Sequence, residues 1–463
     1  MELTFTHYVS LIVVLALSFV PGWYLGRKVK SADDYSLGGR AAGIPLVTGA
    51  ILGTIIGGAA TLGTAQLAFS FGLCAWWFTL GSGIALLIMA LFYARKLRSS
   101  SVTTISEYLV TAFGPAAGPV TSIAATLGIF FSIVASGLTA VHLFSAIFHL
   151  PNYLTCVLIL AIVLAYVLVG GIGGSGGAGI FKTVLLFVTL FAGGFAALSM
   201  SSGVTQLFAS FPSSYGDIFG QGVGNGLYSL GAMIVGVIST QSYVQALLSA
   251  KSEKVAAQAC GLAALICIPV GLPSIAIGMF MKLHHPEIAP IQALPLFLIN
   301  YLPAWLGGAA LTGLILSAMG SIGGLALGCG TMIARDIFGN VLHIQDSKKL
   351  LWINRMSVVA ITVLSLLFVL ANLNSYVLNW NYMSMALRGA GVFIPLTCAI
   401  ALPGRVHPSW GRASIMAGVL VAIGWTVFYH EAANSLLLGL MASCCFILPG
   451  FWFGRSERLS SEE

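Results

Sequence analysis

Long apolar runs alternate with short polar connections along almost the whole chain. A helix rises 1.5 Å per residue, so about 20 apolar residues are needed to cross the hydrocarbon core of a bilayer. Runs of this kind predict thirteen membrane-spanning helices, at about 5–26, 44–72, 74–97, 118–149, 152–170, 178–202, 221–248, 256–281, 304–334, 351–372, 380–401, 412–430 and 434–454. The polar residues 455–463 that follow predict a disordered tail.

Glycine interrupts two of these predicted helices. The second contains "GAILGTIIGGAATLGTAQ", and the seventh contains "GQGVGNGLYSLGAMIVG". Interrupted helices in matching positions of two inverted halves indicate the central site of a secondary transporter. Unwound backbone leaves carbonyl oxygens free for a cation and amide groups free for a solute. We therefore expect breaks at 53–58 and at 224–229, with an ion and a solute in neighbouring sites.

The composition supports a membrane protein. Only 7% of the residues are charged, 58% are hydrophobic, and the mean hydropathy is +0.99. Ordinary soluble domains carry about a quarter of charged residues, which cover their surface. The chain is therefore predicted to be a polytopic membrane protein, with membrane lipid around it and no nucleic-acid partner.

The basic residues predict the orientation of the chain. Seventeen of the 20 lysines and arginines fall in one set of connections, and only Lys282 falls in the opposite set. Cytoplasmic connections carry the excess of basic residues, so the N-terminus is expected outside the cell membrane and the C-terminus in the cytoplasm. The first apolar run lacks the basic segment of a signal peptide, and is taken as a span.

Reactive clusters are missing from the predicted spans. The eight cysteines lie in apolar runs without metal-ligand spacing, and none of the 13 acidic residues falls at the centre of a span. A membrane enzyme needs paired carboxylates, a metal set or a nucleophile with its base. We therefore expect a transporter and not an enzyme, with no organic cofactor and no obligatory protein partner.

Five segments resemble the sodium/solute symporter family. They are "SADDYSLGGR" (31–40), "GGAATLGTAQLAFSFGLCAWW" (57–77), "RKLRSSSVTTISEYL" (95–109), "STQSYVQALLSAKSEKVAAQA" (239–259) and "LSAMGSIGGLALGCGTMIARDIF" (316–338). The resemblance implies an all-α LeuT-type fold and sodium symport of a small polar or carboxylate-bearing solute by alternating access. It implies a single transmembrane domain with inverted repeats at 44–202 and 221–401. The flanking parts are an extra helix and loop (1–43), two C-terminal helices (412–454) and the tail.

The resemblance also implies positions for the coupling sodium ion. The family's carbonyl ligands fall at Gly53, Ile56 and Ser317, and its two hydroxyl ligands fall at Gly320 and Ser321. Only Ser321 keeps a hydroxyl group. One oxygen is therefore missing from a hard-cation site that prefers several.

A second departure lies in "GGIGGSGGAGIFK" (170–182), which we expect to form a flexible cytoplasmic turn. The family's aspartate here becomes Gly179, and its glutamine becomes Lys182. Positions three apart share a helix face, so a lysine ammonium could occupy the place of the sodium ion. Alternatively, Lys182 extends into water near the helix start. A sodium-independent or proton-coupled transporter therefore stands beside the sodium symporter.

The remaining candidates concern the solute. The resemblance implies contacts on five core helices, and the matching residues here are Thr61, Gln66, Asn225, Tyr228, Ser229 and Asn381. Arg388 is an isolated charge within a predicted span; it is a possible counter-ion for a carboxylate or a structural arginine bonded to neighbouring helices. His142 is a possible proton carrier, because imidazole titrates near neutrality, or a structural histidine.

Overall fold

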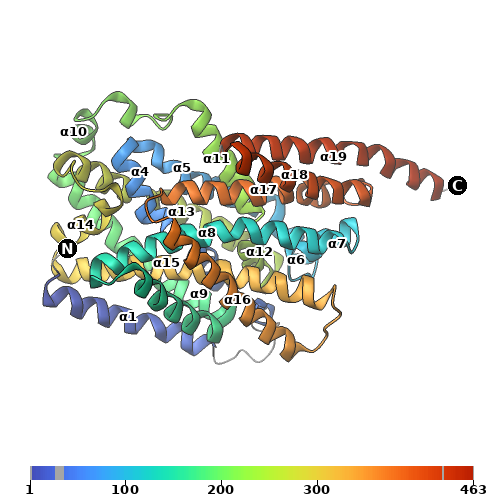
Figure 1. The fold of residues 1–463 in the computed structure, drawn as a ribbon, viewed down its shortest axis with the longest axis horizontal. Helices are drawn as coiled ribbons and strands as arrows, with labels where there is room; N and C mark the ends of the chain where they lie inside the picture. Colours follow the sequence, from blue (N-terminus) through green and yellow to red (C-terminus); the bar gives the residue numbers. More distant parts are fainter. Residues whose placement is uncertain (1–2, 27–35, 430–431, 462–463) are drawn as a thin grey trace.

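The computed structural model describes residues 3–26, 36–429 and 432–461, and these are almost entirely helical (Figure 1). The helices of the first part are α1 (Phe5–Gly26), α3 (Ile44–Ile55), α4 (Thr64–Phe71), α5 (Trp77–Ile88), α6 (Ala94–Ser99), α7 (Ile105–Phe113), α8 (Ala117–Phe148), α9 (Asn152–Met200) and α10 (Val204–Ala209). Those of the second part are α11 (Val223–Ile238), α12 (Gln241–Leu248), α13 (Glu253–His284), α14 (Ala293–Asn300), α15 (Ala304–Met332), α16 (Ser347–Ala371), α17 (Val377–Ala401), α18 (Pro408–Tyr429) and α19 (Ala432–Ser461).

The helical architecture agrees with the apolar pattern. Helices satisfy their backbone hydrogen bonds internally, as hydrocarbon requires. By length and apolar composition, eight helices among the described residues can cross a membrane, or nine if the bent pair α11–α12 is one span. The predicted count of thirteen is therefore not confirmed.

Two predicted irregular segments are helical. The structure is helical throughout α9, which includes the glycine-rich segment that we expected to form a turn. Glycine disfavours a helix by only about 1 kcal/mol per residue, and the loss of backbone hydrogen bonds in an apolar medium costs more. Likewise α19 continues to Ser461, through most of the predicted tail.

The sequence predicts the position of the first helix break correctly and that of the second wrongly. Helix α3 ends at Ile55, and a π-helical turn, Ala59–Gly63, joins the bend after it to α4; this break lies in the predicted interval. The second break lies at 239–240, where α11 and α12 meet at a bend of 44°, and not at 224–229. Gly222 has φ +94° and precedes α11, so the glycines of this segment begin the helix and do not interrupt it.

The packing places the first break at the centre of the molecule. Helix α3 packs against α9 and α15, and α15 contributes the most enclosed apolar span, 94% buried. Helices α18 and α19 lie side by side at one edge of the bundle, and α1 lies at the opposite edge (Figure 1). The backbone freed at the α3 break therefore faces protein and not the lipid-exposed edge.

Candidate functional site

The break after α3 turns backbone carbonyl groups toward α15. The hydroxyl of Ser317 donates to the carbonyl oxygen of Ile56 at 2.6 Å, and the hydroxyl of Ser321 donates to that of Thr54 at 2.6 Å. All four residues are buried. Because buried carbonyl groups need partners, these serine side chains attach the broken end of α3 to α15.

The ammonium group of Lys182 lies at the same break. Its Nζ donates to the carbonyl oxygen of Gly53 at 2.5 Å and to that of Ser317 at 3.1 Å. The side chain is only 2% exposed, and no described carboxylate forms an ion pair with it. A cation is therefore held between α3, α9 and α15 by neutral carbonyl oxygens, and it does not extend into water.

Two glycines make room for this lysine. A Cβ atom at Gly179 would overlap the carbonyl oxygen of Gly49, so the absence of a side chain lets α9 approach α3 closely. A Cβ atom at Gly320 would lie 2.9 Å from Nζ of Lys182. Two of the three positions that depart from the family pattern, Gly179 and Gly320, are thus positions where a larger residue would displace the helix or the ammonium group.

Three side-chain hydrogen bonds, from Arg98 to Ala250, from Lys96 to Ile400 and from Thr104 to Asp336, bring several basic stretches together at one end of the bundle, which we call the basic end. Lys251, Arg335 and Arg405 lie in the chain next to or a few residues from these contacts. Backbone and side-chain hydrogen bonds close this end. The N–H of Lys251 donates to Ala42, and Nε of Arg98 donates to Ala250. Arg27, Lys28 and Lys30, which belong to the same predicted set of connections, lie outside the described residues.

Helix α12 adds two glutamines to this closure. The N–H of Ile105 donates to Oε1 of Gln241 at 2.9 Å, and Nε2 of Gln245 donates to the carbonyl oxygen of Ser36 at 2.7 Å. Both glutamines are buried. They connect α12 to α7 and to the segment before α3, so α12 and the start of α3 are both held at the basic end.

Asp336 is a buried carboxylate that the sequence analysis did not single out. It accepts hydrogen bonds from the hydroxyls of Thr104 (2.9 Å), Ser106 and Ser122. These donors belong to the start of α7 and to α8, whereas Asp336 lies in the π-helical turn after α15. The hydroxyl-rich run 99–106 was the available signal, because a buried carboxylate needs several donors.

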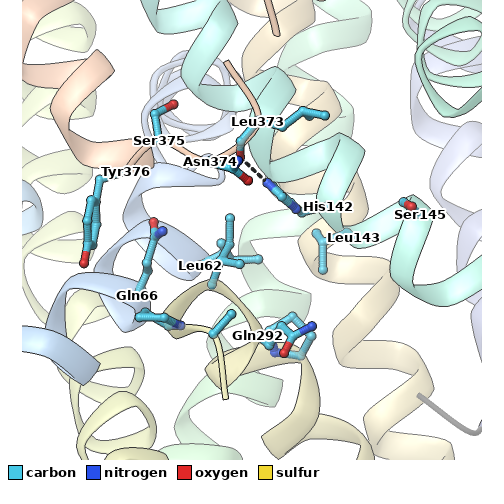
Figure 2. Close-up of a pocket in the computed structure, with 14 residues that line it drawn as sticks. Leu62, Gln66, His142, Leu143, Ser145, Gln292, Leu373, Asn374, Ser375 and Tyr376 are labelled. Atoms are coloured by element: carbon cyan, nitrogen blue, oxygen red, sulfur yellow. Dashed lines mark hydrogen bonds between the residues drawn. The ribbon is translucent and has the colours of Figure 1, made fainter. Parts of the chain in front are cut away.

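A pocket of about 450 Å³ lies away from the basic end, between α4, α8 and the loop before α17 (Figure 2). Gln66 and His142 line it, with Gln292, Asn374 and Tyr376, and its described lining carries no Asp, Glu, Lys or Arg. The Nε2 atom of His142 lies 2.8 Å from the carbonyl oxygen of Leu373, which lies beside it in the pocket wall. The polar groups of its described lining are therefore amides, hydroxyls, an imidazole and backbone groups.

The other predicted solute residues do not line this pocket. The hydroxyl of Thr61 donates to the carbonyl oxygen of Gly57, in the bend after α3, at 3.1 Å. Asn225 is exposed, and its side-chain amide donates to the carbonyl oxygen of Gln221. Tyr228 and its neighbour Ser229 are half-buried on α11. The Tyr228 ring centroid lies 6.2 Å from that of Tyr382 on α17. The predicted set thus falls into separate places.

Asn381 and Arg388 lie on α17, beside α8. The hydroxyl of Ser132 on α8 donates to Oδ1 of Asn381 at 3.1 Å and accepts from Nη2 of Arg388 at 3.1 Å. Arg388 is fully buried, and its Nε and Nη1 atoms find no hydrogen-bond partner in the part of the chain that the structure describes.

Comparison with known sequences identifies relatives that span most of the chain. The sodium:solute symporter family model matches residues 35–402. The human high affinity choline transporter 1 is 24% identical over 423 residues, covering 86% of this chain and 73% of that protein. The osmoregulated proline transporter OpuE of Bacillus subtilis is 24% identical over 442 residues, covering 90% of this chain and 89% of that protein.

Solved structures show the same fold. A Na+-coupled sialic acid symporter in a substrate-bound outward-open state matches with a TM-score of 0.80 at 17% identity, and the match covers 98% of both chains. Mhp1, a nucleobase-cation-symport-1 family transporter, matches with a TM-score of 0.62 at 12% identity, over 92% of this chain and 95% of that one. The fold is the LeuT-type fold of membrane transporters. With the family match over most of its length, this chain belongs to the sodium:solute symporter family.

Proposed function

We propose that this chain is a secondary solute transporter that works by alternating access, and that the ammonium group of Lys182 replaces the coupling sodium ion. One observation carries the proposal: Nζ of Lys182 is bonded to the carbonyl oxygens of Gly53 and Ser317. These are two of the three carbonyl positions that the family resemblance implies for sodium.

The other oxygens of the implied sodium site have partners too. The carbonyl oxygen of Ile56 accepts a hydrogen bond from the hydroxyl of Ser317, and the hydroxyl of Ser321 donates to the carbonyl oxygen of Thr54. Gly320 supplies no hydroxyl. A sodium ion needs several oxygens pointed at one place, so the residues present fit the ion poorly.

Charge repulsion opposes a sodium ion beside Lys182. Two unit charges 4 Å apart repel by about 4 kcal/mol at an effective dielectric constant of about 20. That energy corresponds to a loss of affinity of roughly a thousandfold. A sodium ion therefore binds only if Lys182 withdraws or loses its proton, and in the second case the same lysine would couple transport to protons.

The second candidate is sodium symport, which family membership favours. The solved relative with the highest TM-score given above is a Na+-coupled symporter. In this reading Lys182 moves away when sodium arrives. If the protein is a sodium symporter, sodium should stabilise the wild type. If Lys182 replaces the ion, sodium should have no specific effect, so one experiment separates the two proposals.

We propose the transport cycle from the orientation of the chain. The excess of basic residues assigns the basic end to the cytoplasm, which places the N-terminus outside the cell membrane. The pocket beside Gln66 and His142 then faces the outside, and the state described here is closed to the cytoplasm. The repeats 44–202 and 221–401 would move relative to each other around the breaks, with Lys182 holding α3 against α15.

The solute remains a class and not a compound. The relatives are named for choline and for proline, which are small organic molecules. The pocket offers amide, hydroxyl and imidazole groups. We propose a small polar or zwitterionic solute, taken up through this pocket.

Thermal unfolding of the purified full chain in detergent tests the proposal. A ligand that binds only the folded state raises the midpoint by mass action. We expect equal midpoints for wild type in sodium, potassium and N-methyl-D-glucamine chlorides at matched ionic strength, and a sodium-specific rise in Lys182→Gln. The control is Lys282→Gln, because Lys282 lies over the ring of Phe69, 5.0 Å from its centroid, and not at the α3 break. A sodium-specific rise in wild type would favour sodium symport.

A further inference from the structure

Arg388 has an unusual environment for a buried cation. It is fully buried on α17, and no described carboxylate forms an ion pair with it. Its Nη2 contacts the hydroxyl of Ser132 and the sulfur of Met385, which is a weak acceptor, whereas Nε and Nη1 have no partner. Buried arginines are normally paired, because an unpaired charge in a protein interior is strongly unfavourable. The unused N–H groups of Arg388 are therefore available to an anionic group.

The arginine ends a row of polar side chains between α8 and α17. Asn381, Ser384 and Arg388 are spaced by three and four residues, so they share one face of α17. Ser132 on α8 bonds to all three of them, and Ser384 also donates to the carbonyl oxygen of Gly128. The row forms a polar track through an otherwise apolar region.

Close packing keeps the track in place. A Cβ atom at Gly128 would lie 2.8 Å from Cβ of Arg388, so the glycine lets α8 approach α17 at this position. The arginine backbone is thereby fixed, while the free edge of its guanidinium group remains unbonded. A rigid backbone with unused donors is what a preorganised binding group requires.

Helices that pack around Arg388 determine in which conformational state an anion could reach it. Its electrostatic neighbours are Tyr243 on α12 and Cys329 on α15, and it does not line the pocket beside Gln66. Helix α12 is also the element that Gln241 ties down at the closed basic end. Arg388 is thus covered in the present state, and movement of α12 away from α15 would uncover it.

We infer that Arg388 is an anion subsite on the route to the basic end, and that it binds the carboxylate group of the transported solute. The inference rests on the proposed transport function and assigns the chemical class of its solute. A guanidinium group binds a carboxylate through two parallel hydrogen bonds, which a neutral or purely cationic solute cannot form. The carboxylate would receive the unused N–H groups and compensate the buried charge.

The test measures thermal unfolding of the full chain in detergent with matched probes that differ in a carboxylate. The pairs are propionate with propionamide, betaine with choline, and proline with prolinol, each in a potassium-salt buffer. Potassium chloride against potassium methanesulfonate, whose anion has no carboxylate, tests for an inorganic anion. The variants are Arg388→Met and Arg388→Lys. The control is Arg412→Gln, because Arg412 is half-exposed at the start of α18 and its Nη2 donates to the hydroxyl of the nearby Ser409.

We expect at least one carboxylate, and not its partner without a carboxylate, to raise the midpoint of wild type and of Arg412→Gln. Its apparent affinity should fall at least about tenfold in Arg388→Lys, which loses the bidentate geometry, and disappear in Arg388→Met. Without probes, Arg388→Met should not lower the midpoint, since it removes an unpaired buried charge.

Three results would overturn the inference. The first is a lower midpoint of Arg388→Met without probes, which would make the arginine structural. The second is an equal response of wild type and Arg388→Met, or no carboxylate response at all. The third is a response to chloride alone, which would assign the site to an inorganic anion. The same carboxylate series in Lys182→Gln separates this inference from the proposed role of Lys182, because the Arg388 response should persist there.

Discussion

Nζ of Lys182 lies 2.5 Å from the carbonyl oxygen of Gly53, at the break that follows α3. This bond joins α9 to α3, and the second bond of the same ammonium group, to Ser317, joins both to α15. Three helices that are far apart in the sequence therefore meet at one positive charge. In a transporter of this fold, a contact that holds α3, α9 and α15 together opposes the movement of α3 away from α15.

Gly179 permits the approach of α9 to α3, and its replacement should show this. We expect Gly179→Ala to destabilise the protein by about 1–3 kcal/mol, because the new Cβ would overlap the Gly49 carbonyl oxygen. Thermal unfolding in detergent measures the change. The matched control is Gly424→Ala in α18, where nothing lies within 4 Å of a new Cβ. Equal stability of the two variants would mean that the helices do not meet at Gly179.

Gly320 and Lys182 should be energetically coupled. A side chain at residue 320 would lie 2.9 Å from Nζ, so Gly320→Ser should lower the unfolding midpoint in the presence of the lysine. In Lys182→Gln the same serine has space and offers an additional hydroxyl oxygen to sodium. A double-mutant cycle should therefore give a coupling of about 0.5–3 kcal/mol. Additive effects would contradict the contact between the two residues.

The serine side chains of α15 should be important for the attachment of α3. Ser317→Ala and Ser321→Ala each leave a buried carbonyl group, of Ile56 or Thr54, with one donor fewer. We expect a loss of about 1–3 kcal/mol for each variant, seen as a lower unfolding midpoint. Ser210→Ala provides the comparison, because that exposed hydroxyl bonds only within its own turn, and its change should stay within about 0.5 kcal/mol.

Asp336 should keep the basic end closed. Asp336→Asn replaces one carboxylate oxygen with an NH₂ group, which donates hydrogen bonds and cannot accept them. The hydroxyls of Thr104, Ser106 and Ser122 then share a single acceptor oxygen. Hydrogen–deuterium exchange should then become faster in α7, by about tenfold or more, as the buried network opens. Asp346→Asn is the control, since the side chain of Asp346 caps the first turn of α16, where it accepts from the N–H of Lys348. Unchanged exchange in α7 would show that the network does not hold this end.

The sequence predicts the fold better than it predicts the site. The apolar runs identify most helices, and the glycines near Ile55 indicate the first break correctly, because backbone without side chains is needed there for close packing. The glycines at 220–226 carry a similar pattern, yet they begin α11, since Gly222 adopts a positive φ outside the helix. Composition alone does not distinguish a glycine that starts a helix from one that interrupts it.

Lys182 shows why the candidate site needed the structure. Its spacing from Gly179 places both residues on one helix face, and this is compatible with a lysine in water and with a lysine in the ion site. Only the packing of α9 on α3, which depends on residues more than a hundred positions away, decides where the ammonium group lies. The burial of Asp336 is likewise a tertiary feature, produced by hydroxyl groups from α7 and α8.

Direct binding of radioactive sodium to the purified full chain tests the central claim that Lys182 replaces the sodium ion. The measurement compares wild type, Lys182→Gln and Lys282→Gln by equilibrium binding at constant ionic strength. We predict no saturable sodium binding in wild type or in Lys282→Gln, and a gain of binding in Lys182→Gln, because the carbonyl oxygens of Gly53 and Ser317 then become available. Saturable binding of one sodium ion per wild-type chain would contradict the claim.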